Sequence, residues 1–129
     1  MPDCYEYPSG PLFQAFGEFN RGEWFECHET LEDLWLGEQG EMRDFYQGIL
    51  QVAVALHHWR NGNFKGAVSL LEGGAAYLHK VSVVCQRIDV AGLIETADRM
   101  RDVLIELGPD NLKKLPENLI PKLRLVSLP

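Results

Sequence analysis

The spacing of apolar residues along the chain predicts five α-helices. Apolar side chains recur every three or four residues, the period of one helix face, in five stretches: residues 12–19, about 23–36, about 41–60, 64–80 and 90–107. The third stretch is apolar nearly all round, which is typical of a helix at the centre of a domain. Because no sustained alternation with period two is present, the pattern predicts an all-α fold.

Turn and capping residues predict where these helices begin and end. Pro11 lies near the first position of the first helix, where proline is tolerated. Asn63 and Asp89 are predicted N-caps of the fourth and fifth helices, and Gly108-Pro109 ends the fifth. The short connections favour an array of about five helices in antiparallel hairpins.

The two ends of the chain predict irregular structure around this helical array. Residues 1–10 are predicted to be a loose arm, within a single domain that covers residues 1–129. Residues 110–129 form a tail that is rich in proline and leucine, and its three prolines exclude a regular helix. Its eight Leu, Ile and Val residues indicate that the tail packs, either on the domain itself or on a partner chain, which includes a second copy.

Composition and charge narrow the function classes. Of the 129 residues 46% are hydrophobic, and the net charge is −7. Residues 1–44 hold 11 acidic and 2 basic residues, so no nucleic-acid partner is expected. No apolar run is long enough for a membrane span. The three cysteines are too few and too scattered for a disulfide framework, which favours a reduced, cytoplasmic protein.

A weak internal repeat relates two helix junctions at an offset of 40 residues. Phe19 matches Trp59, Gly22 matches Gly62, and Trp24 matches Phe64 in the aromatic position after the turn. This match supports stacked antiparallel helix pairs. The fourth helix also contains Gly73-Gly74, which either loosens the helix or lets a neighbouring backbone approach closely.

One polar pair of the second helix is predicted to face the interior. At about 100° per residue, His28 and Glu32 lie roughly 60° and 100° from Leu31, inside the apolar arc. A buried carboxylate needs a partner, a proton or a cation. The pair is therefore either a structural hydrogen bond or a site for a metal or for acid–base chemistry.

The third helix carries further polar residues in apolar surroundings. His57 is expected to be buried, and it or His58 could face the pair on the second helix. Gln47 and Gln51 share one narrow face with His58. Candidate catalytic residues are His28, Glu29, Glu32 and His57. Weak candidate metal ligands are His28, Glu32 and His57. Candidate ligand-binding residues are Trp35, Arg43, Gln47 and Gln51.

These residues resemble an uncharacterised prokaryotic family. The matching pattern is Phe19-x-x-Gly22-x-x-Phe25-Glu26-x-His28-Glu29-x-Leu31-Glu32-x-x-Trp35, followed by Arg43, Gln47-Gly48, Ala53 and Leu56-His57. It resembles the domain of unknown function 309 over residues 16–80. The resemblance implies a small all-α array and no established activity. It assigns the family's polar positions to Glu26, His28, Glu29, Glu32, Arg43, Gln47 and His57.

Two hypotheses on function follow from the sequence. The first is a helical interaction or scaffold module in which the His–Glu network is structural and a partner or a second copy binds through the C-terminal tail. The second is a small-molecule or metal-dependent enzyme that uses His28, Glu29, Glu32 and His57. No glycine-rich phosphate loop or recognisable nucleophile signature is present. The sequence therefore names no cofactor and no reaction.

Overall fold

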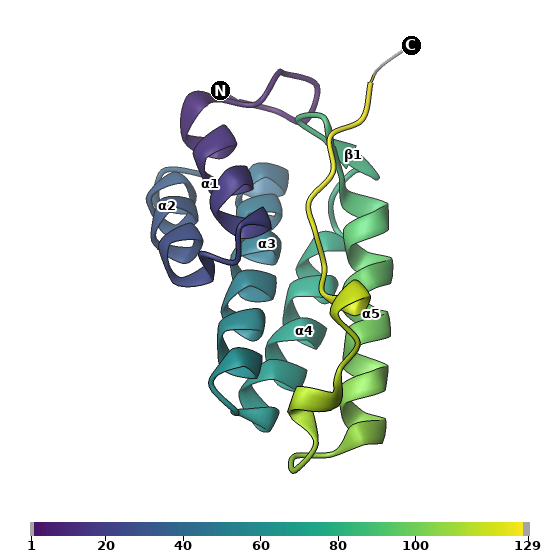
Figure 1. Cartoon of the computed structure of the whole chain (residues 1–129). Helices are drawn as coiled ribbons and strands as arrows, with labels where there is room; N and C mark the ends of the chain where they lie inside the picture. Colours follow the sequence, from purple (N-terminus) through teal and green to yellow (C-terminus); the bar gives the residue numbers. More distant parts are fainter. Residues whose placement is uncertain (1, 128–129) are drawn as a thin grey trace.

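The computed structural model describes residues 2–127 of the chain, and this part is an all-α array with one small β-hairpin (Figure 1). The five helices are α1 (Gly10–Asn20), α2 (Trp24–Leu36), α3 (Gly40–Arg60), α4 (Phe64–Leu78) and α5 (Val90–Leu107). The prediction of an all-α fold with five helices is confirmed. No helix in residues 2–127 combines the length and the apolar character that crossing a membrane requires.

The predicted capping residues lie at the ends of the helices, as expected. Asn63 accepts a hydrogen bond from the N–H of Gly66 at 2.9 Å, and Asp89 accepts one from the N–H of Gly92 at the same distance. Gly108, with φ 78°, follows the last residue of α5. Side-chain caps replace the hydrogen bonds that the first turn of a helix lacks, so these local signals were sufficient to place the ends.

α3 lies at the centre, packed between α2 on one side and α4 on the other. Phe45, Ile49, Val52 and Leu56 of α3 are fully buried. A Cβ atom on Gly74 of α4 would lie 2.9 Å from the carbonyl oxygen of Gly48. The glycine pair in the fourth helix therefore allows the backbones of α3 and α4 to approach closely.

The two helix junctions matched by the repeat have the same backbone geometry. Gly22 and Gly62 have φ of 78° and 79°, and each donates its N–H to the carbonyl three residues earlier at 3.1 Å. The junctions also touch, since Arg60 donates to the carbonyl of Gly22 at 2.7 Å. The rings of Trp24 and Trp59 meet edge to face, with centroids 6.3 Å apart.

A short β-hairpin follows α4, and the sequence pattern did not predict it. Its strands are β1 (Val84–Cys85) and β2 (Ile88–Asp89), joined through Gln86 and Arg87, both with positive φ. Two-residue strands are too short to show an alternating pattern, which is why helical periodicity did not reveal them.

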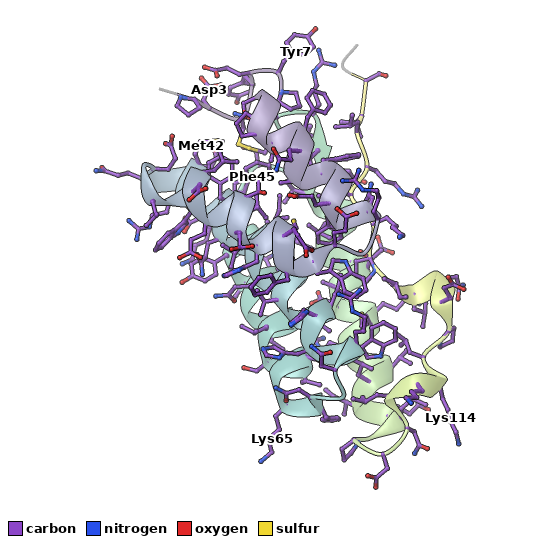
Figure 2. All side chains as sticks on the ribbon, turned by 60° about the vertical axis from the view of Figure 1, so that its left-hand side comes forward. Asp3, Tyr7, Met42, Phe45, Lys65 and Lys114 are labelled. Carbon is purple, nitrogen blue, oxygen red and sulfur yellow. A yellow bond between two sulfur atoms is a disulfide. The ribbon has the colours of Figure 1, made fainter. Side chains whose placement is uncertain are left out.

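The N-terminal arm is attached to this hairpin by a disulfide bond between Cys4 and Cys85. Gln86 adds two hydrogen bonds, from its backbone N–H to the carbonyl of Cys4 and from its amide to the carbonyl of Asp3. Figure 2 shows the bond close to Met42. The expectation that all three cysteines are reduced was wrong for this pair, because residues 81 positions apart meet only in the folded chain.

The C-terminal tail packs on the body of its own chain. It contains two short 3₁₀ helices, η1 (Leu112–Lys114) and η2 (Glu117–Leu119), and is otherwise irregular, as predicted. Leu112, Leu115 and Leu123 are buried. Pro129, one of the three prolines counted in the tail, lies outside the described residues. The apolar content of the tail is thus largely accounted for within one chain.

Replacing Cys4 and Cys85 together by serine is expected to lower the free energy of unfolding by about 2–4 kcal/mol, because the bond restricts a long loop of the unfolded chain. Urea unfolding with and without a dithiol reductant measures this. The reductant should destabilise the wild type and leave the double variant unchanged. Three free thiols in denatured, unreduced wild type, instead of Cys27 alone, would contradict the bond.

Candidate functional site

A cavity of about 220 Å³ opens between α2 and α3. It collects three of the four histidines together with aromatic and aliphatic side chains. Its lining residues are Trp24, Phe25, His28, Val54, His57 and His58. We call this space the histidine cavity. The sequence left open whether His57 or His58 faces the second helix, and in the structure both line this cavity together with His28.

Phe25 forms the rim of the histidine cavity. Its ring centroid lies 6.0 Å from that of His28 and 5.8 Å from that of His57. Half of the Phe25 side chain is exposed, with a relative accessibility of 50%. An exposed phenyl ring beside imidazoles gives the cavity a largely apolar mouth, which favours contact with another apolar group.

His58 is held in one tautomer by the N-cap of α4. The side-chain oxygen of Asn63 already accepts the N–H of Gly66, so the Asn63 amide nitrogen must donate to Nδ1 of His58, 3.2 Å away. An Nδ1 that accepts leaves the proton of a neutral imidazole on Nε2. His58 therefore supplies a hydrogen-bond donor, and within residues 2–127 no protein group accepts from it.

His57 is also bordered by the α3–α4 junction. The side-chain amide of Asn61 lies 3.1 Å from Nε2 of His57, and which of the two groups donates depends on the tautomer of the ring. Nδ1 of His57 is buried and has no partner among the described residues. His57 thus brings a buried ring nitrogen to the histidine cavity.

His28 and Glu32 lie in contact one helical turn apart, but the pair does not face the interior. Nε2 of His28 lies 3.3 Å from a carboxylate oxygen of Glu32, with the side chains 29% and 49% exposed. The expectation of a buried pair was therefore wrong for Glu32. The apolar arc used for that estimate included Phe25 and Leu36, which are themselves exposed. The arc was wider than the face that α2 buries.

The other candidate residues lie away from the histidine cavity. Glu29 points to solvent. The Arg43 guanidinium stacks on the ring of Trp35 at 4.3 Å, and the Gln51 side chain packs against Gly73 of α4. Gln47 is half-buried and does not line the cavity. The four ligand-binding candidates, Trp35, Arg43, Gln47 and Gln51, thus form no common site with the histidines.

The structure gives the metal hypothesis no geometric support. Within residues 2–127, no three His, Cys, Asp or Glu side chains are placed to hold one ion. His28, Glu32 and His57 come from neighbouring helices, but the Phe25 ring lies close to both histidines. A zinc site needs its ligands within about 2.0–2.3 Å of one point, and these three do not converge in this way.

The buried carboxylate belongs to α1, where the sequence analysis did not look for it. Glu18 is only 7% exposed and accepts a hydrogen bond from the hydroxyl of Thr30 at 2.7 Å. Burial, with Glu18 nearby, raises the pKa of the Cys27 thiol far above its usual value. The signal was available, because Glu18 directly precedes the buried Phe19 on a short helix.

Comparison with known proteins supports the resemblance noted in the sequence. Residues 12–70 match the family model described as "Domain of unknown function (DUF309)". An uncharacterised protein of Aquifex aeolicus is 31% identical over 62 residues, which is 47% of this chain and 19% of that protein. The uncharacterised protein YpuF of Bacillus subtilis is 42% identical over 50 residues, 38% of this chain and 29% of that protein.

The matched segment and the histidine cavity coincide. Every residue that lines the cavity lies within residues 12–70, whereas α5 and the tail lie outside. The alignments span less than a third of the length of either relative. The segment that matches the family model is therefore the one that carries the candidate site.

Replacing Glu18 by alanine is expected to lower the free energy of unfolding by about 1–3 kcal/mol, because it removes a buried carboxylate and its hydrogen bond with the Thr30 hydroxyl, which keeps only its longer bond to the carbonyl of Glu26. Glu32→Ala is the matched control and should cost less than about 1 kcal/mol, as expected for an exposed pair. Urea unfolding of both variants checks this. A larger loss for Glu32→Ala would show that the exposed pair, and not Glu18, stabilises the fold.

Proposed function

We propose, from the premise that residues 12–70 belong to the uncharacterised DUF309 family, that this chain is a helical interaction module. Its histidine cavity receives one apolar side chain of a protein partner. The observation that carries the proposal is the size and lining of the cavity between α2 and α3. The helices form the rigid frame, and Phe25 forms the contact surface around the opening.

The volume of the cavity favours a single side chain over a substrate or cofactor. Pockets for small molecules have volumes of roughly 300–1,000 Å³, and this cavity has about 220 Å³. Interfaces concentrate their binding energy in a few anchor side chains that fill such pockets. A leucine or an aromatic residue of the partner is the anchor that these walls favour.

The polar groups around the cavity define the chemistry of the partner. The Nε2–H of His58 is free to donate to a backbone carbonyl next to the anchor. The rim on α2 is acidic, because its exposed residues include Glu26, Glu29, Glu32 and Asp33. The partner segment is therefore an apolar anchor with basic flanks, since opposite charges steer association. The same acidic rim argues against a nucleic-acid partner.

The proposed location of the protein is the cytoplasm. The C-terminal tail remains available for contacts between copies of the chain. The Cys4–Cys85 bond by itself is more common in an oxidising compartment. Both of these residues are buried, which slows attack by other thiols and makes the bond compatible with a reducing cytoplasm.

The alternative function is an enzyme that uses His28, Glu32 and His57, with Glu29 nearby on α2. The observation in its favour is the His28–Glu32 contact at the mouth of a cavity that also contains His57. A carboxylate that orients an imidazole is a common arrangement for general base catalysis. Arg43 would not take part, because it stacks on Trp35 outside the cavity.

A photo-crosslinking amino acid in place of Phe25 is expected to give a discrete adduct with a second protein in living cells, because this side chain borders the proposed contact. Phe13 is the matched control. It is 49% exposed on α1, against 50% for Phe25, and lies outside the cavity lining. Electrophoresis after irradiation measures the adduct.

Filling the cavity should abolish the adduct at position 25. Val54→Trp places an indole in the space while its backbone and helix remain, and circular dichroism confirms folding. Equal adducts at positions 13 and 25, or an adduct that persists with Val54→Trp, would contradict an anchor site in the cavity.

The His28→Ala variant distinguishes between the two proposed functions, an interaction module and an enzyme. If the chain is an interaction module, His28→Ala should change the yield of the crosslinked adduct at position 25 by less than about threefold. His28 contributes only one wall of the cavity and an exposed contact with Glu32. Native mass spectrometry of the unsupplemented protein should show no bound metal or small molecule. A bound ligand that His28→Ala removes would favour the enzyme instead.

A further inference from the structure

The end of the tail lies along the body and forms an antiparallel β-bridge with β2. After η2 the chain runs extended beside α5, back to the end of the array that holds β1 and the N-terminus (Figure 1). The carbonyl of Arg124 accepts the N–H of Asp89 at 2.9 Å, and Val126 donates its N–H to the carbonyl of Arg87 at 2.7 Å. Leu125 pairs antiparallel with Ile88. Main-chain addition of this kind is a common mode of peptide recognition.

Asn20 at the end of α1 binds the backbone of this segment. Its amide nitrogen donates to the carbonyl of Leu123 at 2.9 Å, and its amide oxygen accepts the N–H of Leu123 at 2.8 Å. Lys122 adds a hydrogen bond to the carbonyl of Asn20 at 2.8 Å. An amide that bonds both main-chain groups of one residue recognises an extended backbone independently of its side chain.

Side chains add a simple sequence requirement. Pro121 and Leu123 are buried, whereas Lys122 and Arg124 between and after them are exposed. This alternation is the one that a strand shows when one face is covered. The groove formed by Asn20, residues 87–89 and the first turn of α5, here the tail groove, therefore selects an extended segment with apolar residues two positions apart.

The tail is held by few buried side chains. Of residues 110–127 only Leu112, Leu115, Pro121 and Leu123 are buried. Open hollows of about 250 Å³ and 270 Å³ lie beside the tail, next to the first turn of α5 and next to Trp59. Segments with few buried apolar contacts open more readily than core elements, so this segment can separate while the helices stay packed.

The fit of the segment and its chain connection favour the same segment from a second copy as an occupant. Residues 122–126 already match the groove through main-chain hydrogen bonds to Asn20, Arg87 and Asp89, and a second copy offers the identical segment. The connection to α5 consists of Gly108, with positive φ, and the exposed Pro109 and Asp110. Such an exposed connection can redirect the tail to a neighbouring molecule.

We propose that the tail groove is a peptide-recognition site that accepts residues 120–126 of a second copy of this chain as well as its own. Two chains that exchange tails form a reciprocal dimer in which every groove contact is retained. The attached tail has a high effective concentration. Exchange therefore requires a high protein concentration or a break between α5 and the tail. This site is independent of the histidine cavity.

The experiment uses the full chain with a protease site inserted between Pro109 and Asp110. After cleavage, a fluorescent peptide of residues 119–127 added in excess is expected to replace the cleaved tail and to show saturable fluorescence anisotropy. A Leu123→Asp peptide should bind at least about tenfold more weakly, because a charge would enter the buried position. Leu125→Ala is the matched peptide control and should bind within about threefold, since the Leu125 side chain is exposed.

The Asn20→Ala substitution in the cleaved protein should weaken binding of the wild-type peptide by about tenfold, as expected for the loss of two main-chain hydrogen bonds. The Phe25→Ala variant should bind the peptide normally. Absence of saturable binding, or equal binding of the Leu123→Asp peptide, would overturn the proposed site.

Two uncut chains with different tags test exchange between copies directly. After mixing at high concentration they are expected to co-purify, and chains with Leu123→Asp are not. Circular dichroism of the Leu123→Asp chain verifies that its helices are formed. Failure of wild-type chains to co-purify at any concentration would overturn exchange between copies.

Discussion

The contact between the backbones of α3 and α4 is the constraint on which the rest of the structure depends. It requires glycine at positions 48 and 74, because a Cβ at Gly74 would meet the Gly48 carbonyl. α4 covers α3 on one side and α2 covers it on another. α1 then packs on α2, and α5 packs on α4. The histidine cavity is the space that remains at the α2–α3 contact, next to the half-exposed Phe25.

The repeated helix junctions place the functional groups. Each junction uses a glycine with positive φ, and the two touch through Arg60 and the pair Trp24–Trp59. The second junction also provides Asn61, which lies beside His57, and Asn63, whose amide sets the tautomer of His58. A turn that closes a hairpin thus also determines which imidazole nitrogen is free to donate.

The proposed roles of the histidine cavity and the tail groove are two kinds of recognition on one small frame. The cavity offers a confined apolar space with one donor from His58, which suits a single side chain. The tail groove offers main-chain partners through Asn20 and the β2 edge, which suits an extended backbone. Both would use the rigidity of the helices to hold their contact groups in place.

The sequence by itself determined the helices, their caps and the matched junctions, because these depend on neighbours within four residues. It also singled out His28 and the histidines of the third helix but left open which of them meet, and it placed Glu32 inside and overlooked Glu18. Only the tertiary structure decided the Cys4–Cys85 bond, the β-bridge between the tail and β2, and the burial of Glu18. These features depend on which distant segments come into contact, and the periodicity of a single helix carries no information about that.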